Sequence, residues 1–154
     1  AYTYGARSWF AMRHGPGPFS VGAAVHADKT APAIGEVFGE LNQLLSGGVS
    51  ASELEGAKDS IKLAMPARFE TTVDVTSALA ELVVYDLPPD DFEARLARVD
   101  AVTEVDVKRV AQAYLHPRAM RVVVVGDKAK VEPTLEVLHL GPAQALDPYG
   151  NPVK

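Results

Sequence analysis

Several features that often reveal function are missing from this chain. It has no cysteine, which excludes a thiolate nucleophile, a disulfide and a cysteine-ligated zinc ion but leaves the compartment open between bacterial periplasm and cytoplasm. Basic charge is also scarce, with 15 Lys and Arg against 20 Asp and Glu. The basic residues form no stripe that could follow a phosphate backbone, so we expect no nucleic-acid partner. No apolar run approaches the roughly 20 residues of a membrane span, and no signal peptide is visible at the start.

Motifs for catalysis or metal binding are equally absent. No histidine lies in HExxH or HxxEH spacing, and there is no GxSxG. The histidines are His14, His26, His116 and His139. The loop HGPGP at 14–18 lacks the GK[ST] ending of a phosphate loop, and Asp90 and Asp91 are typical first-turn helix charges. Ser8 and Ser20 have no base near them in the sequence. We therefore predict no metal or cofactor site in this chain, and no activity when it is alone.

What the sequence does contain is the pattern of one folded domain. Hydrophobic residues make up 47% and charged residues 23% of the 154 residues, which is typical of a globular protein. Residues 2–12 and 19–26 alternate like the strands of a hairpin. Helical periodicity follows in residues 28–48, 51–65, 70–86, 90–99 and 103–114, with capping boxes at Ser50 and Thr103.

The end of the chain adds one more predicted strand. RVVVVGD, residues 121–127, is the kind of β-branched run that is buried on both faces of a sheet. A short helix is predicted in 133–140, and residues 141–154 read as an irregular tail. The fold class is therefore α+β, expected as a two-layer sandwich of helices packed on a mostly antiparallel sheet.

Segments spread over nearly the whole chain resemble one protein family. They are AYTYGARSWF, VHADKTAPAI, SASELEGAKDSI, ARFET, LPPDDFEARLARVDAVTEVDVKRVAQAYLHP and VVVVGD. Their order and spacing are similar to those of the pitrilysin, insulinase and mitochondrial processing peptidase family of zinc peptidases, the inverzincins. In that family one α+β half carries HxxEH and zinc, whereas the other half lacks this motif and helps to hold the peptide. The resemblance implies that residues 1–140 are the C-terminal part of a non-catalytic half.

The resemblance also assigns a role to Tyr4. The non-catalytic half of the family carries an arginine and tyrosine pair that contacts the substrate backbone, and Tyr4 matches the tyrosine. Its arginine partner would precede Ala1, so we expect an N-terminally truncated domain. Tyr4 is then expected to orient the substrate carbonyl, whereas Tyr2 and Trp9 are read as packing residues. Arg7 is read as a solvated or hairpin-pairing charge.

Two functions remain open at this stage. The first is the substrate-binding, non-catalytic half of a zinc-dependent endopeptidase, with a peptide substrate and an HxxEH-bearing partner half that holds the zinc. That half would lie in the same polypeptide or in a separate subunit. The second is a proteolytically inactive structural subunit of the same fold. An exposed edge of the hairpin would in either case favour self-association.

Overall fold

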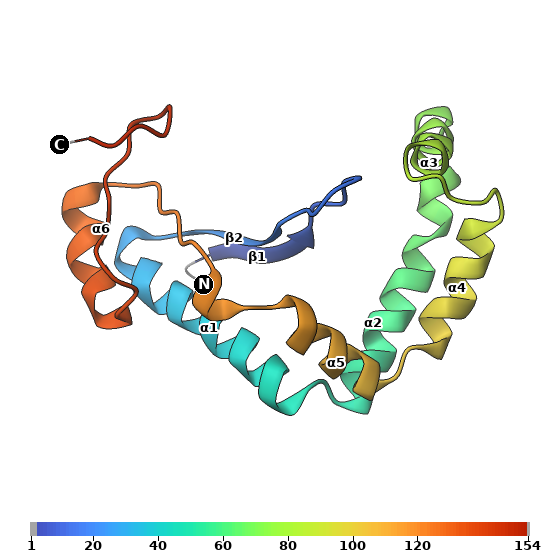
Figure 1. Ribbon diagram of the computed structural model, residues 1–154, viewed down its shortest axis with the longest axis horizontal. Coiled ribbons are helices and arrows are strands. Elements are labelled where there is room, and N and C mark those ends of the chain that lie inside the picture. The colour runs from blue at the N-terminus through green and yellow to red at the C-terminus, as the bar shows by residue number, and fades with distance from the viewer. Residues whose placement is uncertain (1–2, 154) are drawn as a thin grey trace. The chain divides into compact units, whose positions relative to one another are not determined.

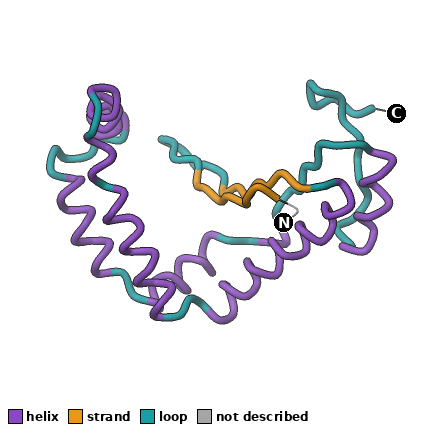
Figure 2. Tube along the Cα trace, turned by 180° about the vertical axis from the view of Figure 1, so that it is seen from behind, coloured by secondary structure: helices purple, strands orange, loops and turns teal. Residues whose placement is uncertain are grey.

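The chain has an α+β fold, as the sequence predicts. The computed structural model describes residues 3–153, and of Tyr4 it describes the backbone only. Figure 1 gives the order of the elements along the chain, and Figure 2 separates helices, strands and loops by colour. The chain forms two compact units, one from residues 3–9, 20–40 and 117–153 and the other from residues 10–19 and 41–116.

The sheet is an antiparallel hairpin of two strands. It consists of β1 (Thr3–Phe10) and β2 (Phe19–Val25). In the first unit the Thr3 hydroxyl donates to the Ala24 carbonyl, 2.8 Å away. In the second unit the Ala11 amide donates to the Pro18 carbonyl at 3.0 Å. The rings of Phe10 and Phe19 are in contact at a tilt of 44°, with their centroids 4.9 Å apart, which is a favourable cross-strand aromatic pair.

The first unit also contains helical segments, in residues 20–40 and in residues 117–153. A 3-10 turn, η1 (Ala27–Lys29), leads into α1 (Thr30–Gly47), of which residues 30–40 belong to this unit and residues 41–47 to the second. Helix α6 (Lys128–Leu135) runs into a second turn, η4 (Glu136–Leu138). Asp127 begins α6, because its carboxylate accepts the Ala129 amide at 3.2 Å. The predicted helix at 133–140 therefore starts earlier, at Lys128. Its Val131 is buried.

The predicted strand at 121–127 is wrong. Residues 121–127 form no strand, although η3 (Pro117–Ala119) just before them is ordered. A strand needs a neighbour that receives its main-chain hydrogen bonds, and within residues 3–153 no segment pairs with this run. Its valines are exposed instead of buried, with Val123 at 80% and Val125 at 96%.

The second unit is helical. Four helices follow one another: α2 (Ala51–Ala64), α3 (Thr72–Val84), α4 (Asp91–Ala101) and α5 (Glu104–Tyr114), with the 3-10 turn η2 (Pro66–Phe69) between α2 and α3. Helices α2 and α4 lie side by side (Figure 1). The capping boxes predicted at Ser50 and Thr103 are present, and Thr71 adds a third with Asp74. These local signals explain why the helix starts follow the sequence so closely.

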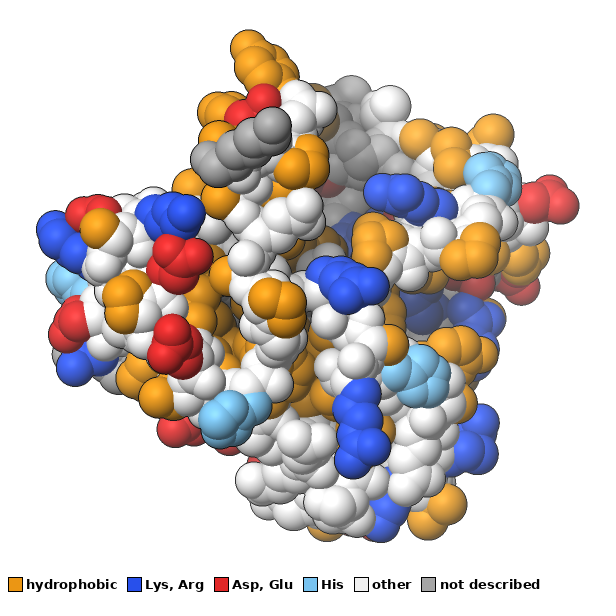
Figure 3. Space-filling model, turned by 60° about the vertical axis from the view of Figure 1, so that its left-hand side comes forward, with side chains coloured by type: hydrophobic (Ala, Val, Ile, Leu, Met, Phe, Trp, Pro, Cys, Tyr) orange, Lys and Arg blue, Asp and Glu red, His pale blue; other side chains and the backbone are white. Residues whose placement is uncertain are grey.

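The buried core of each unit is small. Buried apolar side chains within the described residues are Ala31 and Val131 in the first unit and Leu41, Ala78, Leu82, Ala111 and Leu115 in the second. Many other apolar side chains reach the surface, where they alternate with charged ones on the face shown in Figure 3. Burial of apolar area is the main favourable term in folding, so each of these core side chains matters.

The tail also contains ordered structure. Leu146 and Pro152 form an isolated antiparallel bridge. Asp147 lies at the turn between them, and its carboxylate accepts the backbone amides of Tyr149 and Asn151 at 2.9 and 2.8 Å. These bonds lower the pKa of Asp147, with the side-chain amide of Asn151 contributing most.

Candidate functional site

Tyr4 lies in β1, the strand that carries the predicted substrate contact. Its side chain lies outside what the structure describes, and Tyr2 lies outside the described residues altogether. The role of Tyr4 as a substrate contact therefore stays a prediction. What the structure supplies is the strand around it, from Thr3 to Trp9.

The main chain of β1 has one side that faces β2 and one that does not. Residues on an antiparallel strand point their amide and carbonyl groups alternately to the two sides. The Ala11 amide, just after β1, donates to the carbonyl of Pro18, just before β2. Continued back along the strand, the alternation turns the groups of Arg7 and Trp9 toward β2 and those of Ala6 and Ser8 away from it. No other strand pairs with β1 within residues 3–153. Ala6 and Ser8 thus present main-chain donors and acceptors on an open sheet edge, the arrangement that binds extended peptides.

One face of β1 carries an aromatic side chain, Trp9, and a cationic one, Arg7. Trp9 lies over Gly22 of β2, where an added Cβ would stand 3.4 Å from the indole ring. Trp9 is still 50% exposed. Trp9 therefore packs against the hairpin, as predicted, and keeps half of its surface for another contact. Arg7, two residues before it, is exposed and shares its face by the period of two.

The histidines do not meet in a metal site. His14 lies in the hairpin turn with its ring 5.9 Å from that of Tyr85, and His26 precedes η1. His116 follows α5, and His139 ends η4 with a φ of +50°. Over residues 3–153, no group of three or more His, Asp or Glu side chains is placed to hold a metal ion. The described helices include none that is long and apolar enough to cross a membrane.

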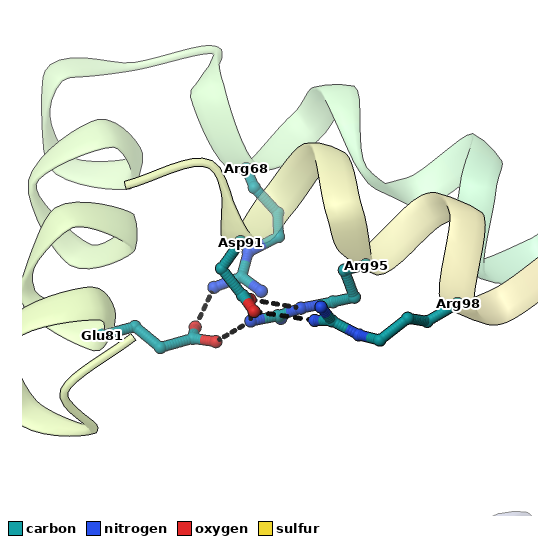
Figure 4. A network of polar contacts seen from close by, with 5 residues as sticks. All are labelled: Arg68, Glu81, Asp91, Arg95 and Arg98. Atoms are coloured by element: carbon teal, nitrogen blue, oxygen red, sulfur yellow. Dashed lines mark hydrogen bonds and ion pairs between the residues drawn. The ribbon is translucent and has the colours of Figure 1, made fainter. Parts of the chain in front are cut away.

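A cluster of charged side chains joins η2, α3 and α4 in the second unit (Figure 4). Glu81 accepts hydrogen bonds from Arg68 and, at 2.8 Å, from Arg95. Asp91 accepts from Arg95 at 2.6 Å and from Arg98 at 2.7 Å. From its position in the sequence, Asp91 was predicted only as a first-turn helix charge. The i,i+4 spacing of Asp91 and Arg95 was the available signal, since it places the two on one face of a helix.

An aromatic ring completes this cluster. Phe92 has the guanidinium carbons of Arg68 and Arg95 at 5.0 and 4.9 Å from its ring centre. Phe69 meets the same ring edge-on at 5.3 Å. Both arginines are thus held by carboxylates and by cation–π contacts. The cluster is built for cohesion between helices, because its arginines and acids satisfy one another.

Both acids of the cluster have lowered pKa values. Burial opposes ionisation of Glu81, but hydrogen bonds from Arg68 and Arg95 outweigh it and the pKa is lowered. For Asp91, the hydrogen bonds from Arg95 and Arg98 lower the pKa. A lowered pKa in the folded state means that the ionised form stabilises folding. This contribution is complete above the ordinary carboxyl range and is lost as pH falls through and below it.

We expect the double variant Glu81→Gln with Asp91→Asn to lower the melting temperature at pH 7 far more than at pH 3. The reason is that the unfolded state takes up protons on these two carboxylates before the folded state does, so their stabilisation of the wild type shrinks as pH falls through and below the ordinary carboxyl range. Thermal unfolding followed by circular dichroism at both pH values measures this. Glu70→Gln, at an exposed carboxylate, is the control and should change little at either pH. An equal difference at both pH values would contradict the role of these charges.

Comparison with known proteins gives a match in structure alone. No family model and no curated protein matches the sequence. A solved chain described as a peptidase M16 inactive domain from Pseudomonas fluorescens superposes with a TM-score of 0.66 at 22% sequence identity. The superposition covers 75% of this chain but only 27% of that one. At this identity the likeness concerns the fold. The chain therefore has the fold found in a peptidase M16 inactive domain.

Proposed function

We propose that this chain is the substrate-holding, non-catalytic half of a zinc-dependent endopeptidase of the M16 type. The observation that supports this most strongly is the likeness to an M16 inactive domain, which agrees with the family resemblance of the sequence. In this proposal a separate half, with HxxEH, carries the zinc and the catalytic glutamate. That half supplies the activated water for peptide hydrolysis.

The contribution of this chain is to hold the peptide. An extended substrate adds as a third strand along β1, with hydrogen bonds to the main chain of Ala6 and Ser8. This mode of binding depends on backbone groups, so it accepts many sequences and fixes the peptide in one orientation. Tyr4 lies in the same strand, and its hydroxyl is proposed to donate to the substrate carbonyl.

Peptide addition to β1 can be tested by hydrogen exchange on the 154-residue chain. An extended, threonine-rich octapeptide in excess is expected to slow exchange at the Ser8 amide and not at the outward amide of Ala23 on β2. Ser8→Pro removes the amide that the peptide needs and should abolish the effect. Ala23→Pro is the matched control, because it blocks the edge of β2 and should leave binding intact.

The same experiment separates the two functions that the sequence leaves open. Protection at β1 that Ser8→Pro abolishes supports the substrate-holding half. No protection at either edge, with both proline variants folded by circular dichroism, would contradict peptide binding. It would favour the interpretation as a structural subunit.

A further inference from the structure

The open edge of β1 carries one large aromatic side chain and one cation on the same face. Trp9 and Arg7 alternate with Ser8, and their small neighbours Gly5 and Ala6 leave the rest of that stretch almost without side-chain bulk. Within the described residues, no acidic group forms an ion pair with Arg7. A binding edge of this composition does not treat all peptides equally.

The register of an added strand decides which peptide side chains meet Trp9 and Arg7. A peptide that bonds to Ala6 and Ser8 in antiparallel orientation places its own residues opposite Arg7 and Trp9 in non-hydrogen-bonded pairs. In such pairs the Cα atoms are only about 4.5 Å apart, and the side chains are at their closest. The two peptide residues are separated by one position, because Arg7 and Trp9 are.

From this placement we propose that β1 selects extended peptides in which a large apolar side chain is followed, two positions later, by a carboxylate. The apolar side chain packs on the exposed part of Trp9, whose indole lies over Gly22 of the hairpin. The carboxylate pairs with Arg7. The order follows from the antiparallel direction, in which the peptide passes Trp9 before Arg7. This inference rests on the proposed peptide addition at β1 and names the peptides that it favours.

Each of the two contacts adds little to the affinity for the peptide, but their combined effect is large enough to measure. An aromatic cross-strand pair and an exposed ion pair each contribute only weakly to binding. Together they correspond to roughly a tenfold change in Kd. The ion-pair part should weaken as salt is added, because exposed charges are screened.

The test uses labelled octapeptides of threonine and serine that differ at two positions only. Read from the N-terminus, these positions hold phenylalanine then glutamate in the first peptide and phenylalanine then lysine in the second. The third peptide has glutamate then phenylalanine, and the fourth has alanine at both positions. Fluorescence anisotropy with the 154-residue chain gives each Kd. The peptide with phenylalanine before glutamate is expected to bind roughly tenfold more tightly than the alanine peptide. The reversed peptide is expected to gain much less.

Two variants tie this preference to its residues. Trp9→Ala should remove the advantage of phenylalanine, and Arg7→Glu should transfer the preference from the glutamate peptide to the lysine peptide. Tyr149→Ala and Arg121→Glu are the controls, because both change exposed residues of the same types outside β1. Neither control should alter the order of the four affinities.

The outcomes distinguish this inference from the proposed function on which it rests. Equal binding of all four peptides, with Ser8 still protected from exchange, would overturn the selectivity and leave peptide addition intact. A preference that survives both Trp9→Ala and Arg7→Glu would also overturn it. Failure of every peptide to bind would overturn the selectivity and the proposed function together.

Discussion

Tyr4→Phe in the proposed two-half enzyme is expected to lower kcat at least about tenfold while folding stability changes little. The substitution keeps the ring and removes only the hydroxyl donor. In the proposed reaction, negative charge develops on the substrate carbonyl oxygen as water attacks. A hydrogen bond to this oxygen strengthens in the transition state, so its loss affects turnover more than substrate binding. Steady-state kinetics on a quenched peptide, together with thermal unfolding, measure both effects.

Tyr2→Phe is the control for this experiment, because it deletes the same group two positions earlier and should leave activity nearly unchanged. Wild-type kcat/KM in Tyr4→Phe would remove the proposed role of the hydroxyl. So would a Tyr4 hydroxyl found bonded inside the protein core. Either result would strengthen the interpretation as a structural subunit.

Leu82→Ala is expected to lower the free energy of unfolding by about 2 to 4 kcal/mol. Leu82 is only 9% exposed and shares the inner face of α3 with Ala78. The described part of the second unit has few other large buried side chains. Few neighbours are therefore available to repack into the cavity that the alanine leaves. Chemical denaturation followed by circular dichroism gives the change.

The neighbouring Val83 supplies a matched control on the same helix. It is 82% exposed, and Val83→Ala is expected to change the free energy of unfolding by no more than about 0.5 kcal/mol. If the two variants lost equal stability, the inner face of α3 would not be the one that the structure assigns.

The charged cluster illustrates what sequence reading missed. Arg68, Glu81 and Arg95 lie on η2, α3 and α4, and no spacing rule connects residues on three different elements. Only the tertiary structure, which brings η2, α3 and α4 together, places Glu81 between the two guanidinium groups (Figure 4). Within α4 the Asp91–Arg95 pair was readable, because both partners belong to one helix.

The sequence by itself determined the features that depend on near neighbours. The capping boxes at Ser50 and Thr103 and the turn residues of 14–18 act on groups within a few residues of one another, so the sequence shows them directly. The α+β class follows from the periods of the segments, which are also local patterns. The tertiary structure alone decided the features that need distant partners. The four valines of 122–125 have strong β-propensity, but a strand exists only where another strand receives its hydrogen bonds. In the same way, only the folded hairpin decides that Ala6 and Ser8 face outward while Trp9 rests on Gly22.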